Sequence, residues 1–208
     1  ACGMPRSSGN LTLLQSPLDA RTLSDAAFDA LLPELARTQS AQYWTPLSVA
    51  RRAADMFRAY RASRVLDVGC GPGKFCLSAA ATQPSLDFLG VERRPQLVEA
   101  ASQLAGQLGL ENASFVCGDA FERPWNSFDA FYFFNPFAEN LCPEGGKFDQ
   151  SVELSGIRFL RELRRTSVAL RGLSPGAIFI TYHGLGTPIP SSYELVESEP
   201  AGTDALRV

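Results

Sequence analysis

The sequence predicts an α/β fold: a doubly wound, mostly parallel sheet of about seven strands, with helices on both faces and an antiparallel C-terminal hairpin. Two observations lead to this class. From position 64 onward, short apolar runs alternate with helical stretches, which is the pattern of parallel strands joined by crossover helices. Near the C-terminus, two strand candidates flank a glycine-containing turn and can pair as a hairpin. Because such crossovers are right-handed, the helices are expected to cover both faces of the sheet.

Two helices are expected ahead of the sheet. The first covers residues 25–37, because Ser24 and Asp25 can cap its start and the apolar residues that follow recur at helical spacing. The second runs from Thr45 to about Tyr60, because the Thr45 hydroxyl can cap it and the proline that follows suits the first helical position.

The strands and helices of the sheet follow in alternation. Five strands are expected at residues 65–68, 86–91, 114–117, 128–134 and 177–182. Three helices are expected at residues 74–82, 96–108 and 150–173. The hairpin strands are expected at residues 193–198 and 204–208. The connection over residues 183–191 is shorter than the dozen or more residues that a parallel crossover needs, so the last strands are expected to be arranged differently.

Length and composition fit one domain with an accessory segment. The chain has 208 residues, of which 45% are hydrophobic. We expect a flexible arm over residues 1–20, an N-terminal helical lid over 21–62 and a sheet domain over 63–208. The longest apolar stretch, near residues 130–138, is too short to span a membrane, and the polar N-terminus does not resemble a signal peptide. We therefore expect a cytoplasmic protein without a membrane partner.

The net charge and the thiol-bearing residues give further expectations. The net charge of −3 exerts no global attraction toward nucleic acid. The chain has five cysteines, no Cys-x-x-Cys pair and a single histidine, His183, so no metal site is expected. The cysteines are interpreted as free thiols in a reducing compartment.

The most informative stretch is a predicted buried strand that runs into three glycines and then a helix. The glycines Gly69, Gly71 and Gly73 allow a sharp turn and bring bare backbone against a ligand at the carboxyl end of the strand. A dinucleotide fingerprint fails because Lys74 stands where its third glycine or alanine would be, and a phosphate-loop pattern is absent. The pattern that fits is D-x-G-x-G-x-G beginning at Asp67, whose carboxylate suits a positively charged ligand rather than a pyrophosphate.

This D-V-G-C-G-P-G motif resembles that of the class I S-adenosylmethionine-dependent methyltransferases, which have a Rossmann-like fold. The resemblance covers the chain from about Tyr43 to the end. It implies that residues 63–208 form a Rossmann-like methyltransferase domain, that the cofactor is S-adenosyl-L-methionine and that the protein transfers a methyl group to an acceptor.

The resemblance also implies roles for individual residues. Asp67 would act on the methionine ammonium, directly or through water. Glu92, 23 residues after Gly69, would accept both ribose hydroxyls, and Asp119 would bond the adenine amino group. The segment of Tyr43 and Trp44 would close over the methionine end, or pack as part of an N-terminal lid. The full set of expected cofactor-binding residues is Asp67, Gly69, Cys70, Gly71, Gly73, Glu92, Asp119, Ala120, Asn135, Tyr43 and Trp44.

The expected acceptor site lies at the end of the fourth strand. Asn135, Pro136 and Phe137 resemble a shortened N-P-P-[YFW] signature of amino-methyltransferases, but the second proline is missing. The resemblance slightly favours an amine acceptor, with N-methylation of a protein or a small molecule. His183 could serve as a base, although a loop histidine bonded to backbone is the preferred interpretation.

Several alternatives remain open from sequence. Arg158, Arg161 and Arg165 share a helix face that could contact RNA, but a solvated face is preferred, so no nucleic-acid partner is expected. The partner is then an unknown small molecule or protein acceptor, and the protein is a monomer or a dimer. A non-catalytic module that binds S-adenosylmethionine or serves as a scaffold is the main alternative function. A nicotinamide-dependent oxidoreductase is disfavoured by Lys74.

Overall fold

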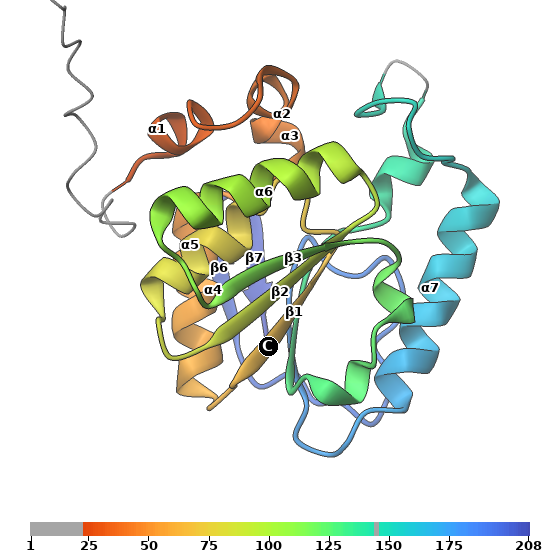
Figure 1. The fold of residues 1–208 in the computed structure, drawn as a ribbon. Helices are drawn as coiled ribbons and strands as arrows, with labels where there is room; N and C mark the ends of the chain where they lie inside the picture. Colours follow the sequence, from red (N-terminus) through yellow and green to blue (C-terminus); the bar gives the residue numbers. More distant parts are fainter. Residues whose placement is uncertain (1–22, 144–145) are drawn as a thin grey trace, which may run out of the picture.

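A computed structural model describes residues 23–143 and 146–208 of the chain. Its centre is a seven-stranded sheet in the order β3-β2-β1-β4-β5-β7-β6 (Figure 1). The strands are β1 (Arg64–Val68), β2 (Asp87–Glu92), β3 (Ala113–Cys117), β4 (Ala130–Phe134), β5 (Ile178–Tyr182), β6 (Ser198–Ala201) and β7 (Asp204–Arg207). Strands β1 to β5 are parallel, whereas β7 runs antiparallel to both β5 and β6. The predicted fold class, including the C-terminal hairpin, is confirmed.

Helices cover both faces of this sheet. The α-helices are α1 (Asp25–Asp29), α2 (Glu34–Thr38), α3 (Ser40–Tyr43), α4 (Leu47–Ala59), α5 (Lys74–Thr82), α6 (Pro95–Leu108) and α7 (Gly156–Arg171). Short 3₁₀ helices are η1 (Ala120–Glu122), η2 (Trp125–Ser127) and η3 (Ala138–Leu141). Figure 1 shows α4, α5 and α6 on one side of the sheet, α7 on the other, and α1 to α3 at the top. Within the described residues, no helix is both long enough and apolar enough to cross a membrane.

The N-terminal helices differ from the sequence prediction. The single helix expected over residues 25–37 is two short helices, α1 and α2, because Pro33 stands immediately before α2 and cannot donate a backbone hydrogen bond within a continuing helix. Thr45 does not cap α4: Pro46 holds the cap position, and the Thr45 hydroxyl lies 3.1 Å from the hydroxyl of Tyr132. The arm expected over residues 1–20 lies outside the described residues.

Two later elements also begin elsewhere than predicted. Helix α7 starts at Gly156 rather than near residue 150, because the Ser155 side chain accepts a hydrogen bond from the backbone N–H of Arg158 and caps the helix there. The first hairpin strand is Ser198–Ala201 rather than residues 193–198. The connection from β5 to β6 contains no helix, as its length indicated.

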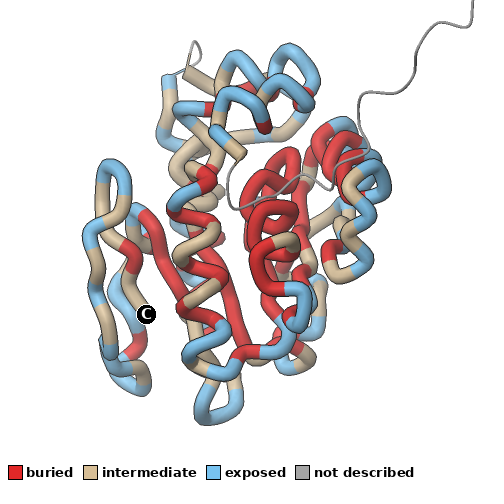
Figure 2. The backbone as a smooth tube through the Cα atoms, turned by 90° about the vertical axis from the view of Figure 1, so that its left-hand side faces the viewer, coloured by how far each residue is buried: buried red, intermediate tan, exposed pale blue. Residues whose placement is uncertain are grey.

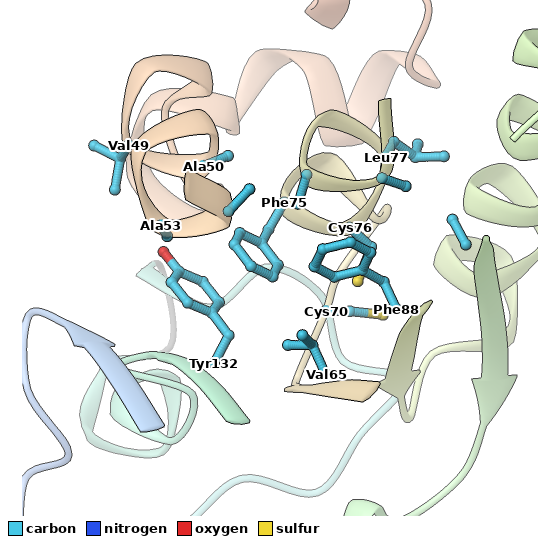
Figure 3. Packing of buried hydrophobic residues seen from close by; sticks show 14 of the residues in the cluster. Val49, Ala50, Ala53, Val65, Cys70, Phe75, Cys76, Leu77, Phe88 and Tyr132 are labelled. Carbon is cyan, nitrogen blue, oxygen red and sulfur yellow. The ribbon is translucent and has the colours of Figure 1, made fainter. Parts of the chain in front are cut away.

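The core has two parts, one on each face of the sheet. On the α4–α5 side, the rings of Phe75 and Tyr132 are stacked with centroids 3.7 Å apart, beside Phe88 and the alanines of α4 (Figure 3). On the α7 side, Trp125 packs on Phe131. Figure 2 shows buried stretches through the interior strands and the helices against them. Because β1 to β5 are parallel, their carboxyl ends meet at one edge of the sheet, where ligands bind in such folds.

Candidate functional site

A cavity of about 300 Å³ opens at the carboxyl ends of β1 to β4. Its walls come from the lid segment before α4, the ends of these strands and the loop that follows β4. The lining includes, among the residues expected from sequence, Tyr43, Trp44, Gly69, Glu92, Asp119, Ala120, Asn135, Pro136 and Phe137. The structure therefore brings nine of the predicted site residues to one cavity.

The glycine loop forms part of the cavity floor. Gly69 and Gly71 adopt φ values of +79° and +55°, a left-handed conformation that side chains other than glycine rarely accept. A β-carbon on Gly69 would stand 3.3 Å from the Pro136 side chain, and one on Gly71 would stand 2.7 Å from Cε3 of Trp44. The loop therefore presents bare backbone to its neighbours. Cys70, Gly71 and Gly73 are buried and do not line the cavity, whereas Gly69 does.

Glu92 places a buried carboxylate in the cavity wall. One of its oxygens accepts hydrogen bonds from the backbone N–H groups of Arg93 and Arg94, at 2.8 and 3.0 Å. The other accepts from the N–H of Gly71 at 3.3 Å. Burial raises the pKa of Glu92, and these hydrogen bonds partly oppose that rise. The two oxygens keep acceptor capacity for hydroxyl groups of a ligand.

Asp119 is held by two arginines. Its Oδ2 lies 3.1 Å from Arg93 and 2.7 Å from Arg165, and its Oδ1 accepts a hydrogen bond from the N–H of Phe121. Burial acts to raise the pKa of Asp119, but the hydrogen bonds from Phe121 and Arg165 outweigh it and the pKa is lowered. Glu162 of α7, which is fully buried, joins the same network through Arg93 and Arg165.

Asp67 lies behind the glycine loop and does not line the cavity. Its carboxylate is buried and accepts a hydrogen bond from the thiol of Cys76 at 3.4 Å. Burial raises its pKa from 3.8 to about 7; the Cys76 hydrogen bond opposes the rise and the charge of Glu92 adds to it. In the described geometry, the cationic group expected beside Asp67 would have to reach it indirectly.

Tyr43 and Trp44 close one side of the cavity together with Phe148 from the loop after β4. The Trp44 and Phe148 rings meet edge to face with centroids 5.5 Å apart. The indole N–H of Trp44 donates to the carbonyl of Ala36 at 2.8 Å, and the Tyr43 hydroxyl donates to the carbonyl of Gly146.

A buried lysine anchors this lid to the glycine-loop helix. Lys74, the first residue of α5, is only 3% exposed. Its ammonium lies 2.7 Å from Asp25 and 2.8 Å from Asp29 of α1, and it donates to the Ser40 hydroxyl at 3.0 Å. At the sequence level Lys74 only excluded a dinucleotide fingerprint. Its partners are 34 to 49 positions away, so no local pattern pointed to this role.

The end of β4 supplies the opposite wall. Asn135 has a φ of +40°, an uncommon backbone conformation that asparagine tolerates better than most residues. Within the described residues, the structure gives its side-chain amide no hydrogen bond, so the amide is available to a ligand. The ring of Phe137 lies 6.2 Å from that of Phe121, nearly parallel to it.

A buried arginine, Arg94, joins Glu92 to the loop after β4. Its guanidinium lies 2.8 Å from Glu139, 2.9 Å from Asp149 and over the ring of Phe148. Arg94 and Glu139 were not predicted as site residues, because they are 45 positions apart in the sequence and meet only in the folded loop.

His183 does not line the cavity, although its ring lies 5.4 Å from that of Phe134, which does. Its Nε2 is 3.1 Å from the Thr203 hydroxyl and its Nδ1 is 3.5 Å from Asp204, both in the C-terminal hairpin. The sequence-based hypothesis of a base at this position stays a prediction. In the part of the chain that the structure describes, no group of three or more His, Cys, Asp or Glu side chains could hold a metal ion.

Comparison with known proteins places this geometry in context. A family model described as "Methyltransferase domain" matches residues 60–183. A Synechocystis tRNA (guanine-N(7)-)-methyltransferase is 34% identical over 104 residues, 47% of this chain and 49% of that protein. One from Microcystis aeruginosa is 48% identical over 54 residues, 26% of each chain. The matches thus span about half or less of these relatives.

Solved structures share the fold. An RNA methyltransferase from Salinibacter ruber, in complex with S-adenosyl-L-homocysteine, has a TM-score of 0.55 at 20% identity, covering 78% of this chain and 90% of that one. A mitomycin 7-O-methyltransferase has a TM-score of 0.52 at 19% identity, covering 77% and 52%.

One expectation from the sequence is wrong. No nucleic-acid partner was expected, because the net charge is −3 and the arginine face was interpreted as solvated, yet several relatives are tRNA methyltransferases. A whole-chain charge does not describe a local surface, since a few unpaired arginines on one face can attract phosphates while acidic residues elsewhere cancel them in the sum.

Proposed function

Because this chain belongs to the methyltransferase-domain family of class I S-adenosylmethionine-dependent methyltransferases, we propose that it transfers a methyl group to a ring nitrogen of a base in RNA. The observation that carries this proposal is the cavity between Glu92 and Asn135. It has a carboxylate and bare backbone on one wall, and an unpaired amide with aromatic rings on the other. The likeness to tRNA methyltransferases supports the choice of RNA as the acceptor.

The residues present fit the methyl donor. The carboxylate of Glu92 would accept the ribose hydroxyls while backbone N–H groups hold it in place. Gly69 offers a wall without a side chain, and the wall of Asp119, Ala120 and Phe121 would border the adenine. The cofactor, when bound, supplies an activated methyl group on a sulfonium centre. The protein then has mainly to position an acceptor, which can contribute about 7–11 kcal/mol.

The acceptor wall suits a base with a free ring nitrogen. A nitrogen such as N7 of guanine carries a lone pair and attacks without first losing a proton. This requirement agrees with a cavity whose lining contains no histidine, the chain's one histidine being His183. The rings of Phe121 and Phe137 would stack on the base, as aromatic side chains do in RNA recognition. The amide of Asn135 would hydrogen-bond to the edge of the base and turn its lone pair toward the methyl group.

A second candidate keeps the amine acceptor expected from sequence. The resemblance of Asn135, Pro136 and Phe137 to the signature of amino-methyltransferases favours it, because the same amide could hold an NH₂ group of a protein or small molecule. The unpaired Asn135 amide in the cavity serves either acceptor, so its position alone does not separate them.

The experiment is a transfer assay with S-adenosylmethionine labelled in the methyl group. The purified protein is incubated in parallel with bulk bacterial tRNA, with proteins from the same cells and with a pool of small amines. We expect label in tRNA, recovered as a ring-methylated purine nucleoside after digestion. If the label is found only in protein or in small amines, the result favours an amine acceptor instead of RNA. Tight binding of S-adenosylhomocysteine with no transfer to any acceptor would contradict both.

A further inference from the structure

Helix α7 turns a mixed apolar and basic face to solvent. Ile157, Leu160 and Val168 are 83%, 66% and 62% exposed, and such exposure is unusual for large apolar side chains. Three further exposed residues, all arginines, lie on the same face. At 3.6 residues per turn, these six side chains fall within an arc of about 100°. We call this face the α7 stripe: Ile157, Leu160, Arg161, Arg164, Val168 and Arg171.

Most of the positive charge of the α7 stripe has no acidic partner among the described residues. Arg158 and Arg165 lie outside the stripe and pair with buried or half-buried carboxylates. Within the stripe, Arg161 lies 3.5 Å from the buried Glu162 and remains 60% exposed. Among the described residues, no carboxylate pairs with Arg164 or Arg171. The only acidic residue of α7 is the buried Glu162, so the charged side chains on the solvent-facing side of the helix are all basic.

Helix α7 flanks the cavity, and the α7 stripe is the exposed side of this helix. Arg165 of the same helix reaches Asp119 at 2.7 Å and lies over the ring of Phe121, both of which line the cavity. Val152 and Leu154, which line it too, belong to the segment that leads into α7. A large molecule that inserts one group into the cavity would therefore extend over this side of the protein.

We propose that the α7 stripe is the surface on which the RNA acceptor docks, an inference that rests on the proposed function. Its arginines contact backbone phosphates, for which the planar guanidinium is well suited, and its apolar side chains pack on riboses and exposed base faces. Charge complementarity favours RNA over a protein partner, because three outward arginines without an outward acid match a polyanion. The phosphate contacts orient the RNA, and the cavity then receives a single base.

The test compares two pairs of exposed arginines. R164Q/R171Q removes the two unpaired arginines of the α7 stripe, whereas R37Q/R61Q removes two exposed arginines elsewhere, on α2 and just after α4. Binding of fluorescent tRNA is measured by anisotropy at several salt concentrations. We expect R164Q/R171Q to weaken binding at least tenfold and to reduce the slope of log affinity against log salt by about 1.5, since each phosphate contact contributes about 0.7–0.9. The control is expected to stay within twofold of wild type.

Other measurements separate this inference from the proposed function. S-adenosylhomocysteine affinity and melting temperature should be unchanged in R164Q/R171Q. If wild type methylates tRNA and R164Q/R171Q binds and methylates it equally well, the stripe is not the docking surface and the proposed function stands. If tRNA binds through the stripe but no methyl is transferred, the inference holds and the proposed function falls. If I157S/L160S changes the sedimentation of the protein while tRNA binding stays intact, the stripe is a protein interface and the inference is overturned.

Discussion

The indole ring of Trp44 lies directly against the α-carbon of Gly71, so that a β-carbon there would stand 2.7 Å from Cε3 of the ring. This contact joins the lid to the glycine loop. A side chain at position 71 is disfavoured for two reasons: its β-carbon would clash with the ring, and the backbone φ of +55° suits glycine. The lid and the loop therefore form one wall of the cavity.

Gly71→Ala is expected to weaken binding of S-adenosylhomocysteine and to lower the melting temperature. The new methyl group would displace the Trp44 ring, and the left-handed backbone adds about 1–2 kcal/mol of strain. The melting temperature is compared among wild type, Gly71→Ala, Trp44→Ala and the double variant. Because Trp44→Ala removes the clash, the loss caused by Gly71→Ala should be smaller in that background. Additive losses would show that the ring does not exclude the side chain.

Glu92→Ala is expected to weaken cofactor binding by about 1.5–3 kcal/mol, roughly 10- to 150-fold. The reason is the loss of a buried acceptor for two hydroxyl groups. Calorimetric titration with S-adenosylhomocysteine measures the change. Glu99→Ala, at an exposed position of α6, is the matched control and should bind as wild type does. A change below twofold for Glu92→Ala would mean that another residue holds the ribose.

Asp67 makes stability depend on pH. Burial raises its folded-state pKa to about 7, above the ordinary value of 3.8. Between these two pKa values, Asp67 keeps its proton in the folded state and loses it in the unfolded chain. The stabilising effect of this bound proton is fully present below about pH 3.8 and is lost as pH rises through about 7. We expect the free energy of unfolding of wild type to fall between about pH 4 and pH 7 relative to Asp67→Asn, and to level off above about pH 7, as measured by urea denaturation. Asp87→Asn, at an exposed site, is the control. If the free energy of unfolding depends on pH in the same way in wild type and in Asp67→Asn, the pKa of Asp67 is not raised.

Asp67 should also make the affinity for the cofactor depend on pH. A bound ammonium near Asp67 favours the carboxylate form, so S-adenosylhomocysteine should bind more tightly at about pH 8 than at about pH 6. In Asp67→Asn this part of the pH dependence should vanish. An unchanged profile in the variant would place the cationic group away from Asp67.

Lys74→Met is expected to release the lid. It removes a buried cation held between Asp25 and Asp29, whose side chains are 46% and 18% exposed, so the loss should lie below the about 3–5 kcal/mol of a fully buried pair. Hydrogen exchange should then rise over residues 25–44 while β1 and β4 stay protected. Ser40→Ala, which removes only the weaker hydroxyl partner, should show a smaller rise. Uniform exchange across lid and sheet would indicate global destabilisation instead of lid release.

The sequence predicted the sheet well, and the reasons are local. Helix α5 was predicted with its observed bounds, Lys74–Thr82, because the glycine loop marks its start without ambiguity. Helix α7 was placed six residues too early, because a capping serine at position 155 is one hydroxyl among several in that stretch. The break between α1 and α2 was missed although Pro33 signalled it, because apolar spacing continued across the proline.

The site residues could be predicted from sequence only where they belong to a recognisable motif. The cavity residues Gly69, Glu92, Asp119 and Asn135 follow strand ends, and parallel strands bring such ends together. The ion pairs Lys74–Asp29, Arg94–Glu139 and Arg93–Glu162 join segments that are distant in sequence, so periodicity and motif spacing contain no signal for them. The arginine face noted in the sequence, Arg158, Arg161 and Arg165, shares only Arg161 with the α7 stripe. Arg165 turns instead toward Asp119, which only the fold places beside it.

The kinetics of Asn135→Ala test the central claim, that this cavity holds the donor on one wall and an acceptor on the other. Turnover with tRNA and the dissociation constant of S-adenosylmethionine are measured on the same preparation, with the rate expressed per folded molecule. We predict that kcat falls about 100-fold, which corresponds to an activation free energy raised by about 2.7 kcal/mol. The Kd for S-adenosylmethionine should stay within about threefold of wild type. An unchanged kcat with a lowered melting temperature would contradict it, because Asn135 would then only support the turn at the end of β4.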